Sequence, residues 1–259
     1  MNKSSKELLI KAVEINPEDV IAHGNLGNMY FNEERYEDAI EAYQKVIQIN
    51  PEQVAAYNNL GNAYAKQERY EDAIETYEKA IQINPEEIAI YCNLGDAYSE
   101  KERYEDAIET YEKAIQINPE ETAAYNNLGN AYAKQERYKD AIEAYQKVIQ
   151  INPEETAAYN NLGNAYSERE RYEEAIETYE KAIQINPEQV AAYNNLGNAY
   201  AKQERYKDAI ETYEKAIQIN PEQVAAYNNL INAYNRTLQN QVKKKPFGFF
   251  RKLFNILRK

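Results

Sequence analysis

Few residues in this chain could carry out covalent or metal chemistry. Its 259 residues include one histidine, His23, and one cysteine, Cys92, which has no histidine near it in the sequence. These two are too few for the tetrahedral ligand set of a zinc site. The sequence also has no glycine-rich phosphate loop and no G-x-S-x-G motif. We therefore expect no catalytic residue, no metal site and no cofactor, and we predict that the chain is not an enzyme.

Asparagines recur instead at a regular spacing, and an asparagine amide both donates and accepts hydrogen bonds, as a peptide group does. Successive copies of the pattern lie 34 residues apart, as Asn93 and Asn127 do. The candidate site residues are Asn58, Asn59, Asn62, Asn93, Asn126, Asn127, Asn130, Asn160, Asn161, Asn164, Asn194, Asn195 and Asn198. Asparagine is a poor helix former. Its repetition therefore indicates that the amides have a task, which is either binding or bridging between helices.

The elements that carry these amides follow from the spacing of the prolines. Seven of the eight prolines are separated by that same interval: Pro17, Pro51, Pro85, Pro119, Pro153, Pro187 and Pro221. We number each repeat from its first residue, so that Val54 is position one of the second repeat. The period predicts an N-terminal half-repeat at 1–19, six repeats at 20–223, a capping helix at 224–242 and a tail at 243–259.

Each repeat is predicted to contain two helices. In the second repeat, Tyr57, Leu60, Gly61 and Tyr64 share one stripe of a first helix. The second helix is expected to bury Tyr70, Ala73, Ile74, Tyr77, Ala80 and Ile81. Glycine is costly inside a helix, so Gly61 indicates a close helix approach, with Ala73 as its expected small counterpart. Asn50 and Pro51 are expected to be the N-cap and the first residue of the next helix.

These residues resemble the tetratricopeptide repeat (TPR). The second repeat reads Tyr57-x-x-Leu60-Gly61-x-x-Tyr64, then Ala73-x-x-x-Tyr77, then Pro85, and the match extends over nearly the whole chain. Tyrosine stands where the family pattern has tryptophan and phenylalanine. The resemblance implies an all-α fold, a right-handed superhelical solenoid of antiparallel helix pairs.

The resemblance also places positions five, six and nine of the first helices on an exposed, concave face. There the asparagines are similar to the asparagine ladder in the TPR superhelix of O-GlcNAc transferase, although we recognise no transferase domain in these residues. We therefore predict a non-catalytic interaction scaffold or adaptor that binds a protein or peptide as an extended segment. The alternative is a structural module that self-assembles through its repetitive faces, and the sequence leaves the oligomeric state open.

The tail differs from the rest of the chain in charge. The net charge is −13, but seven basic residues and no acidic ones lie in 243–259, so the remainder carries −20. An acidic body argues against nucleic acid as the partner. The candidate contacts of this basic amphipathic tail are Lys243, Lys244, Lys245, Phe247, Phe249, Phe250, Arg251, Lys252, Leu253, Phe254 and Leu257. They could bind an anionic membrane surface, the acidic body of the chain itself, or another protein.

Neither a secretory signal nor an apolar run long enough to cross a bilayer is recognised in the sequence. We therefore expect a cytoplasmic protein, with peripheral membrane attachment through the tail as the alternative.

The turn between the paired helices generates a first testable prediction. The family usually places glycine there, but this chain has Glu34, Glu68, Glu102, Glu136, Glu170 and Glu204. In a left-handed conformation each glutamate costs on the order of 1 kcal/mol relative to glycine. We predict that Glu136→Gly leaves the melting temperature unchanged or raises it. A clear fall in a thermal melt would show that the turn has been misread.

Overall fold

The computed structural model describes residues 3–244, and the side chains of residues 6–240. Within 3–244 the chain forms helices and turns and no strand. Two compact units can be distinguished, Met1–Glu136 and Arg137–Lys259, called here the N-terminal and C-terminal units. None of the helices described in either unit has both the length and the apolarity that crossing a bilayer requires.

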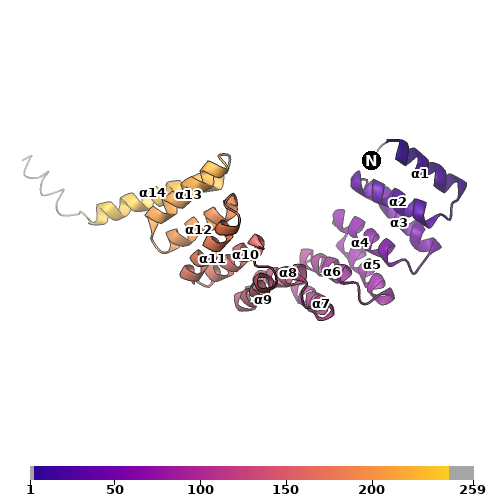
Figure 1. Cartoon of the computed structure of the whole chain (residues 1–259), viewed down its shortest axis with the longest axis horizontal. Helices are drawn as coiled ribbons and strands as arrows, with labels where there is room; N and C mark the ends of the chain where they lie inside the picture. The colour runs from indigo at the N-terminus through magenta and orange to yellow at the C-terminus, as the bar shows by residue number, and fades with distance from the viewer. Residues whose placement is uncertain (1–2, 245–259) are drawn as a thin grey trace, which may run out of the picture. The chain divides into compact units, whose positions relative to one another are not determined.

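The helices recur with the predicted period, and Figure 1 shows them as successive antiparallel pairs within each unit. In the repeats between residues 20 and 223, first helices start at the same interval as the prolines and have 13 residues, whereas second helices have 14. The N-terminal unit holds α1 (Lys3–Ile15), α2 (Val20–Asn32), α3 (Tyr36–Ile49), α4 (Val54–Lys66), α5 (Tyr70–Ile83), α6 (Ile88–Glu100), α7 (Tyr104–Ile117) and α8 (Thr122–Lys134). The C-terminal unit holds α9 (Tyr138–Ile151), α10 (Thr156–Glu168), α11 (Tyr172–Ile185), α12 (Val190–Lys202), α13 (Tyr206–Ile219) and α14 (Val224–Lys244). The predicted all-α helical repeat is confirmed.

The candidate tail contacts fall almost entirely outside this description. Lys243 and Lys244 end α14, but their side chains are not described. The others lie outside the described residues: Lys245, Phe247, Phe249, Phe250, Arg251, Lys252, Leu253, Phe254 and Leu257. Their binding therefore stays a prediction from the sequence.

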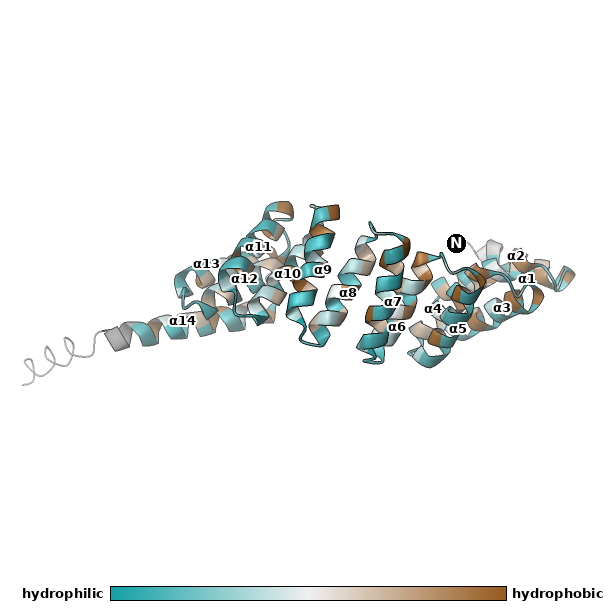
Figure 2. Ribbon diagram, turned by 90° about the horizontal axis from the view of Figure 1, so that it is seen from below, coloured by the Kyte–Doolittle hydropathy of each residue, from teal (hydrophilic) through white to brown (hydrophobic). Residues whose placement is uncertain are grey.

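Helix packing follows a two-step pattern. Where both helices of a repeat lie in one unit, the first helix packs most extensively on the second, and that second helix packs on the next first helix, as α4, α5 and α6 do. Hydrophobic and hydrophilic residues are interspersed along the helices (Figure 2), and the buried residues are mostly apolar. In the second repeat Leu60, Tyr64, Ala73, Ile74 and Tyr77 are buried. Burial of this stripe is the main source of stability, since neither helix is long enough to persist alone in water.

The close approach at the helical glycine involves tyrosine and not alanine, which corrects the expectation for Ala73. A Cβ atom added to Gly61 would collide with the ring of Tyr77, which comes from position 24 on the second helix. The same glycine and tyrosine positions meet in the first, third, fifth and sixth repeats. Glycine is required here because a tyrosine ring occupies the space that a side chain would need.

The turn inside each repeat adopts a left-handed conformation, the case in which glutamate is expected to cost more than glycine. All six glutamates have positive φ, between 56° and 60°. In the second repeat the Glu68 amide donates to the Ala65 carbonyl at 2.9 Å, and the Arg69 amide donates to the Tyr64 carbonyl at 3.0 Å. These two bonds form a Schellman motif at the C-terminus of α4. The Arg69 guanidinium also lies 4.4 Å from the centre of the Tyr64 ring, a cation–π contact that stabilises the turn.

The turn between repeats differs from the prediction. Helix α4 begins at Val54 with Gln53 as its N-cap, so Pro51 lies in the turn before the helix and not at its first position. Asn50 follows the end of α3, and its side-chain oxygen accepts from the Glu52 amide at 3.2 Å. Asparagine and proline shape a turn here, because the asparagine side chain satisfies a backbone amide that no helix satisfies.

The glycine contact generates a second prediction. In Gly163→Ala the new Cβ would lie 2.5 Å from the Tyr179 ring. Overpacking costs about 1–3 kcal/mol, which exceeds the gain of about 1 kcal/mol from replacing a helical glycine. We predict a lower free energy of unfolding by urea denaturation. The matched control is Gly24→Ala, whose Cβ would meet only Val46 at 3.9 Å, and this variant should be neutral or more stable. Equal effects of the two substitutions would contradict the proposed tyrosine contact.

Candidate functional site

The tyrosine that packs on each glycine also holds the neighbouring asparagine at position nine. Its hydroxyl donates to the asparagine Oδ1, at 2.6 Å from Tyr77 to Asn62 and 2.7 Å from Tyr179 to Asn164. The same bond occurs in the first and sixth repeats, from Tyr43 to Asn28 and from Tyr213 to Asn198. Burial raises the pKa of Tyr179 to about 12, so the hydroxyl keeps its proton at neutral pH and can donate.

A second donor reaches the same oxygen from the following repeat. The Nδ2 atom of a position-six asparagine donates to the position-nine Oδ1 of the repeat before it. These bonds run from Asn59 to Asn28 at 3.2 Å, from Asn127 to Asp96 at 2.9 Å, from Asn195 to Asn164 at 3.0 Å and from Asn229 to Asn198 at 3.1 Å. Each bond joins two successive first helices. Together the position-six and position-nine residues form what we call the amide ladder.

The third repeat provides an internal check on which atom of each amide accepts. There Asp96 replaces asparagine at position nine, and a carboxylate can only accept. Tyr111 and Asn127 both donate to its Oδ1, at 2.6 and 2.9 Å. Partial removal from water raises the pKa of Asp96, although its side chain remains accessible, and the hydrogen bond from Tyr111 opposes that rise. The matching geometry supports Oδ1 as the acceptor in the other repeats.

In the ladder step formed by Asn195 and Asn198, one donor group and one acceptor atom remain unused. The Asn195 Nδ2 and the Asn198 Oδ1 are engaged in the bonds above. The Asn195 Oδ1 and the Asn198 Nδ2 have no hydrogen-bond partner among the described residues. Both residues line a groove of about 850 Å³ that lies wholly in the C-terminal unit. Its other walls include Asn164, Ser167, Glu168, Lys202, Tyr213, Asn229, Asn232 and Arg236.

Position five is more enclosed than the sequence predicts, and this corrects the expectation of an exposed side chain for Asn160 and Asn194. Asn160 and Asn194 are each only 7% exposed. The Asn160 Nδ2 donates to the Thr156 carbonyl of its own helix at 3.1 Å. Asn58 and Asn126 are partly buried. The prediction considered only the partner helix within the repeat, but the adjacent first helices also pack together, as α10 and α12 do, and they cover position five.

Three of these position-five amides have a buried oxygen without a partner. The Oδ1 atoms of Asn126, Asn160 and Asn194 are enclosed and accept no hydrogen bond among the described residues. An unsatisfied buried polar atom costs free energy, so these amides weaken the packing locally. In the second repeat the corresponding atom is satisfied, because the Asn58 Oδ1 accepts from Asn93 at 2.8 Å.

The remaining predicted residues can be placed directly. Asn130, at position nine, is exposed, and Asn161, at position six, is partly exposed. Cys92 is half-buried at position five, and burial raises the pKa of its thiol to about 11. His23 places its Nε2 atom 3.0 Å from the Pro17 carbonyl, and Tyr91 donates to the Pro85 carbonyl from the same position of the third repeat. His23 therefore has a structural contact. Among the described residues, no group of three or more potential metal ligands was found.

Sequence reasoning missed several residues of this surface. The position-24 tyrosines were predicted to pack only, yet their hydroxyls reach the ladder. Asn28 and Asp96 were not assigned to the site, although both accept from the next repeat. The signal lay in the constant offset of 15 residues between the two bonded positions.

The fold and the ladder together define a class, the helical repeat proteins with an amide-lined face on their first helices. Family models of the tetratricopeptide repeat match successive stretches of the chain, at residues 8–41, 27–68, 52–120, 92–156, 144–177, 163–204 and 190–223. The chain belongs to the tetratricopeptide repeat family.

Solved structures give the same result. YrrB, described as a TPR protein with an unusual peptide-binding site, is 28% identical, with 73% of this chain and 98% of YrrB covered and a TM-score of 0.59. MamA is 28% identical over 67% of this chain and 94% of MamA, with a TM-score of 0.60. A TPR repeat-containing protein from Cytophaga hutchinsonii is 18% identical over 88% of this chain and 93% of that one, with a TM-score of 0.72, and shares the fold. Among curated proteins no significant match was found.

Proposed function

We propose that this chain is a protein-interaction scaffold, an adaptor whose amide ladder binds the backbone of an extended peptide segment. The observation that carries the proposal is the unused donor and acceptor of one ladder step, the Asn198 Nδ2 and the Asn195 Oδ1, at the wall of a groove. An extended peptide presents the complementary pair of groups at every residue.

The strength and the selectivity of such binding follow from the kind of contact. Each hydrogen bond adds only about 0.5–1.5 kcal/mol net, so useful affinity requires several ladder steps acting together. Because backbone groups are the same in every sequence, the ladder itself selects for extended shape and not for particular side chains. Selectivity is left to the charged groove residues Glu168, Lys202 and Arg236, which lie at position thirteen of successive first helices.

The structural role of the same asparagines is compatible with this proposal. Ladder bonds between neighbouring first helices use the Nδ2 of position six and the Oδ1 of position nine. A purely structural ladder accounts for those atoms and leaves the Asn195 Oδ1 and the Asn198 Nδ2 without a task. The peptide-binding site described for YrrB supports binding by a member of this family, and the repeat fold is typically non-catalytic. The cytoplasmic location and the membrane contact of the tail stay predictions.

A binding experiment tests the proposal. A pool of random-sequence peptides is selected on the wild-type chain, and the affinity of a recovered peptide is measured by calorimetry. The test variant removes the position-six amides of the last three first helices, Asn161→Ala, Asn195→Ala and Asn229→Ala. We expect at least a tenfold loss of affinity, since about 1.4 kcal/mol is a factor of ten and several bonds are lost. The melting temperature should change little, because alanine's helix propensity offsets the lost exposed bonds.

The matched control removes the same number of side-chain amides from exposed positions of the second helices. Gln150, Gln184 and Gln218 are exposed there, and their replacement by alanine should leave the affinity unchanged. A triple asparagine variant that binds the peptide as tightly as the wild type would overturn the proposal. A large fall in its melting temperature would assign the ladder to structure.

A further inference from the structure

Large apolar side chains are exposed mainly at the two ends of the described chain. At the N-terminal end Leu8, Ile15 and Ile21 are 66%, 77% and 76% exposed. At the C-terminal end, the exposed residues of α14 are Val224, Tyr227, Ile231, Tyr234 and Leu238. The remaining large exposed apolar residues, Ile83, Ile117 and Ile219, are each 37% exposed. The five exposed residues of α14 are spaced three and four apart in the sequence, which places them on one helical stripe. We call this surface the α14 stripe.

The two ends correspond to the two halves of one repeat. Helix α1 has the register of a second helix, since Leu9 and Ile15 lie one repeat before Tyr43 and Ile49 of α3. Helix α14 has the register of a first helix, since Ile231 lies one repeat after Gly197 of α12. In the complete pairs of each unit, a first helix covers its second helix. The described residues hold neither a first helix for α1 nor a second helix for α14.

At the glycine–tyrosine contact, the two terminal helices differ from the complete repeats in side-chain size. The residue in α14 is larger than the usual glycine, and the residue in α1 is smaller than the usual tyrosine. Inside the chain, this contact pairs glycine with tyrosine, as Gly197 does with Tyr213, and leaves no room for a Cβ atom. In α14 the glycine is replaced by Ile231, so an ordinary second helix with its tyrosine would clash. In α1 the tyrosine is replaced by the smaller Leu9. A larger residue on one half and a smaller one on the other keep the combined volume similar, which a packed core tolerates best.

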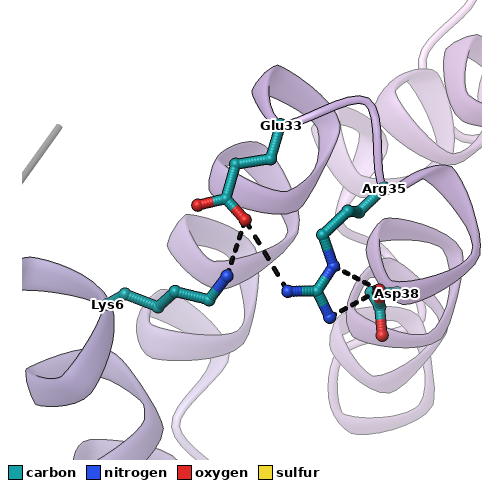
Figure 3. Close-up of polar contacts among 4 residues, drawn as sticks. All are labelled: Lys6, Glu33, Arg35 and Asp38. Atoms are coloured by element: carbon teal, nitrogen blue, oxygen red, sulfur yellow. Dashed lines mark hydrogen bonds and ion pairs between the residues drawn. The ribbon is translucent and has the colours of Figure 1, made fainter. Parts of the chain in front are cut away.

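Helix α1 is held on the body of the chain by its opposite side (Figure 3). The Lys6 Nζ lies 2.6 Å from the Glu33 Oε2, and the Arg35 guanidinium links Glu33 to Asp38. Lys6 also lies over the Tyr30 ring, 4.8 Å from its centre. These contacts with α2 and the following turn fix α1 and leave Leu8 and Ile15 on the outside.

We propose that the α14 stripe of one copy packs on α1 of a second copy, so that two half-repeats from different chains complete one repeat. Among its described residues each copy presents one exposed surface of each kind, so the contact is head-to-tail. A head-to-tail contact can add further copies in one direction. The occupant of both exposed surfaces is thus a second copy of this chain, and the contact lies outside the groove that carries the proposed peptide binding.

The dependence of association on salt concentration distinguishes this end-to-end contact from docking of the basic tail. Each chain carries a net charge of −13, which repels another copy at low ionic strength and is screened by salt. An apolar end-to-end contact should therefore strengthen as salt is added. The alternative occupant is the basic tail, docked on the acidic surface of the chain, and that contact should weaken with salt.

Sedimentation equilibrium of the full chain tests the proposal through a complementation design. One variant blocks the N-terminal end, Leu8→Asp, and the other blocks the C-terminal end, Ile231→Asp; both residues are exposed, so helix content by circular dichroism should be unchanged. We expect the wild type to self-associate as its concentration and the salt rise, and each variant alone to stay near 30.1 kDa. An equimolar mixture should form a species of twice that mass and no larger one, because only one intact pair of ends remains.

The control is Ala157→Asp, on an exposed residue of α10 away from both ends, which should associate like the wild type. A second pair of variants tests the volume argument. Leu9→Tyr should weaken association at least tenfold, and adding Ile231→Gly to the same chain should restore it. A wild type that stays monomeric, a mixture that forms no dimer, or an Ile231→Asp variant that still self-associates would each overturn the proposal.

Discussion

The contact between a tyrosine ring and a glycine is the interaction on which both the fold and the site depend. The ring lies where a glycine side chain would be, so the two helices of a repeat approach closely. The ring is almost completely buried, with Tyr77, Tyr111, Tyr179 and Tyr213 among the most enclosed side chains. Its hydroxyl donates to the position-nine residue of the first helix, next to that glycine. Packing and hydrogen bonding are therefore properties of one side chain.

This coupling explains how a solvent-accessible ladder is kept in order. Exposed asparagine side chains would ordinarily sample several rotamers and lose entropy on binding. Here the buried tyrosine holds one oxygen and the next repeat supplies a second donor to it, as Tyr179 and Asn195 do for Asn164. The orientation of an amide held in this way is set before any ligand arrives. A preorganised row of weak donors and acceptors can bind an extended chain that a mobile row would bind poorly.

Periodic features of the architecture were predictable from the sequence, because the signal is repeated and local. The prolines fixed the period, and the stripe through Leu60 and Tyr64 identified the first helices. The family's usual glycine raised the left-handed conformation at Glu68 as a possibility, and the structure shows it. Each of these predictions depends only on residues close together in the chain, where helical spacing and backbone sterics decide the outcome.

Predictions that depended on packing between helices were less accurate. Ala73 was chosen as the partner of Gly61 because both are small, whereas the space is filled by Tyr77. Position five was assigned to the exposed face, but contacts between successive first helices bury Asn160 and Asn194. A helical wheel gives the angle of each side chain but not the number of neighbouring helices. The hydrogen bond from the position-24 tyrosine escaped notice for the same reason.

Recognition of the peptide backbone by the amide ladder is the central claim, and backbone substitution in the ligand tests it most directly. In a peptide selected on the wild-type chain, single backbone amides are replaced by esters, which removes one N–H donor and leaves every side chain in place. The account predicts that ester substitution at several positions weakens binding more than alanine substitution of the side chains at those positions. Ester-substituted peptides that all bind with unchanged affinity would contradict it, even if the helices and the ladder are placed as described.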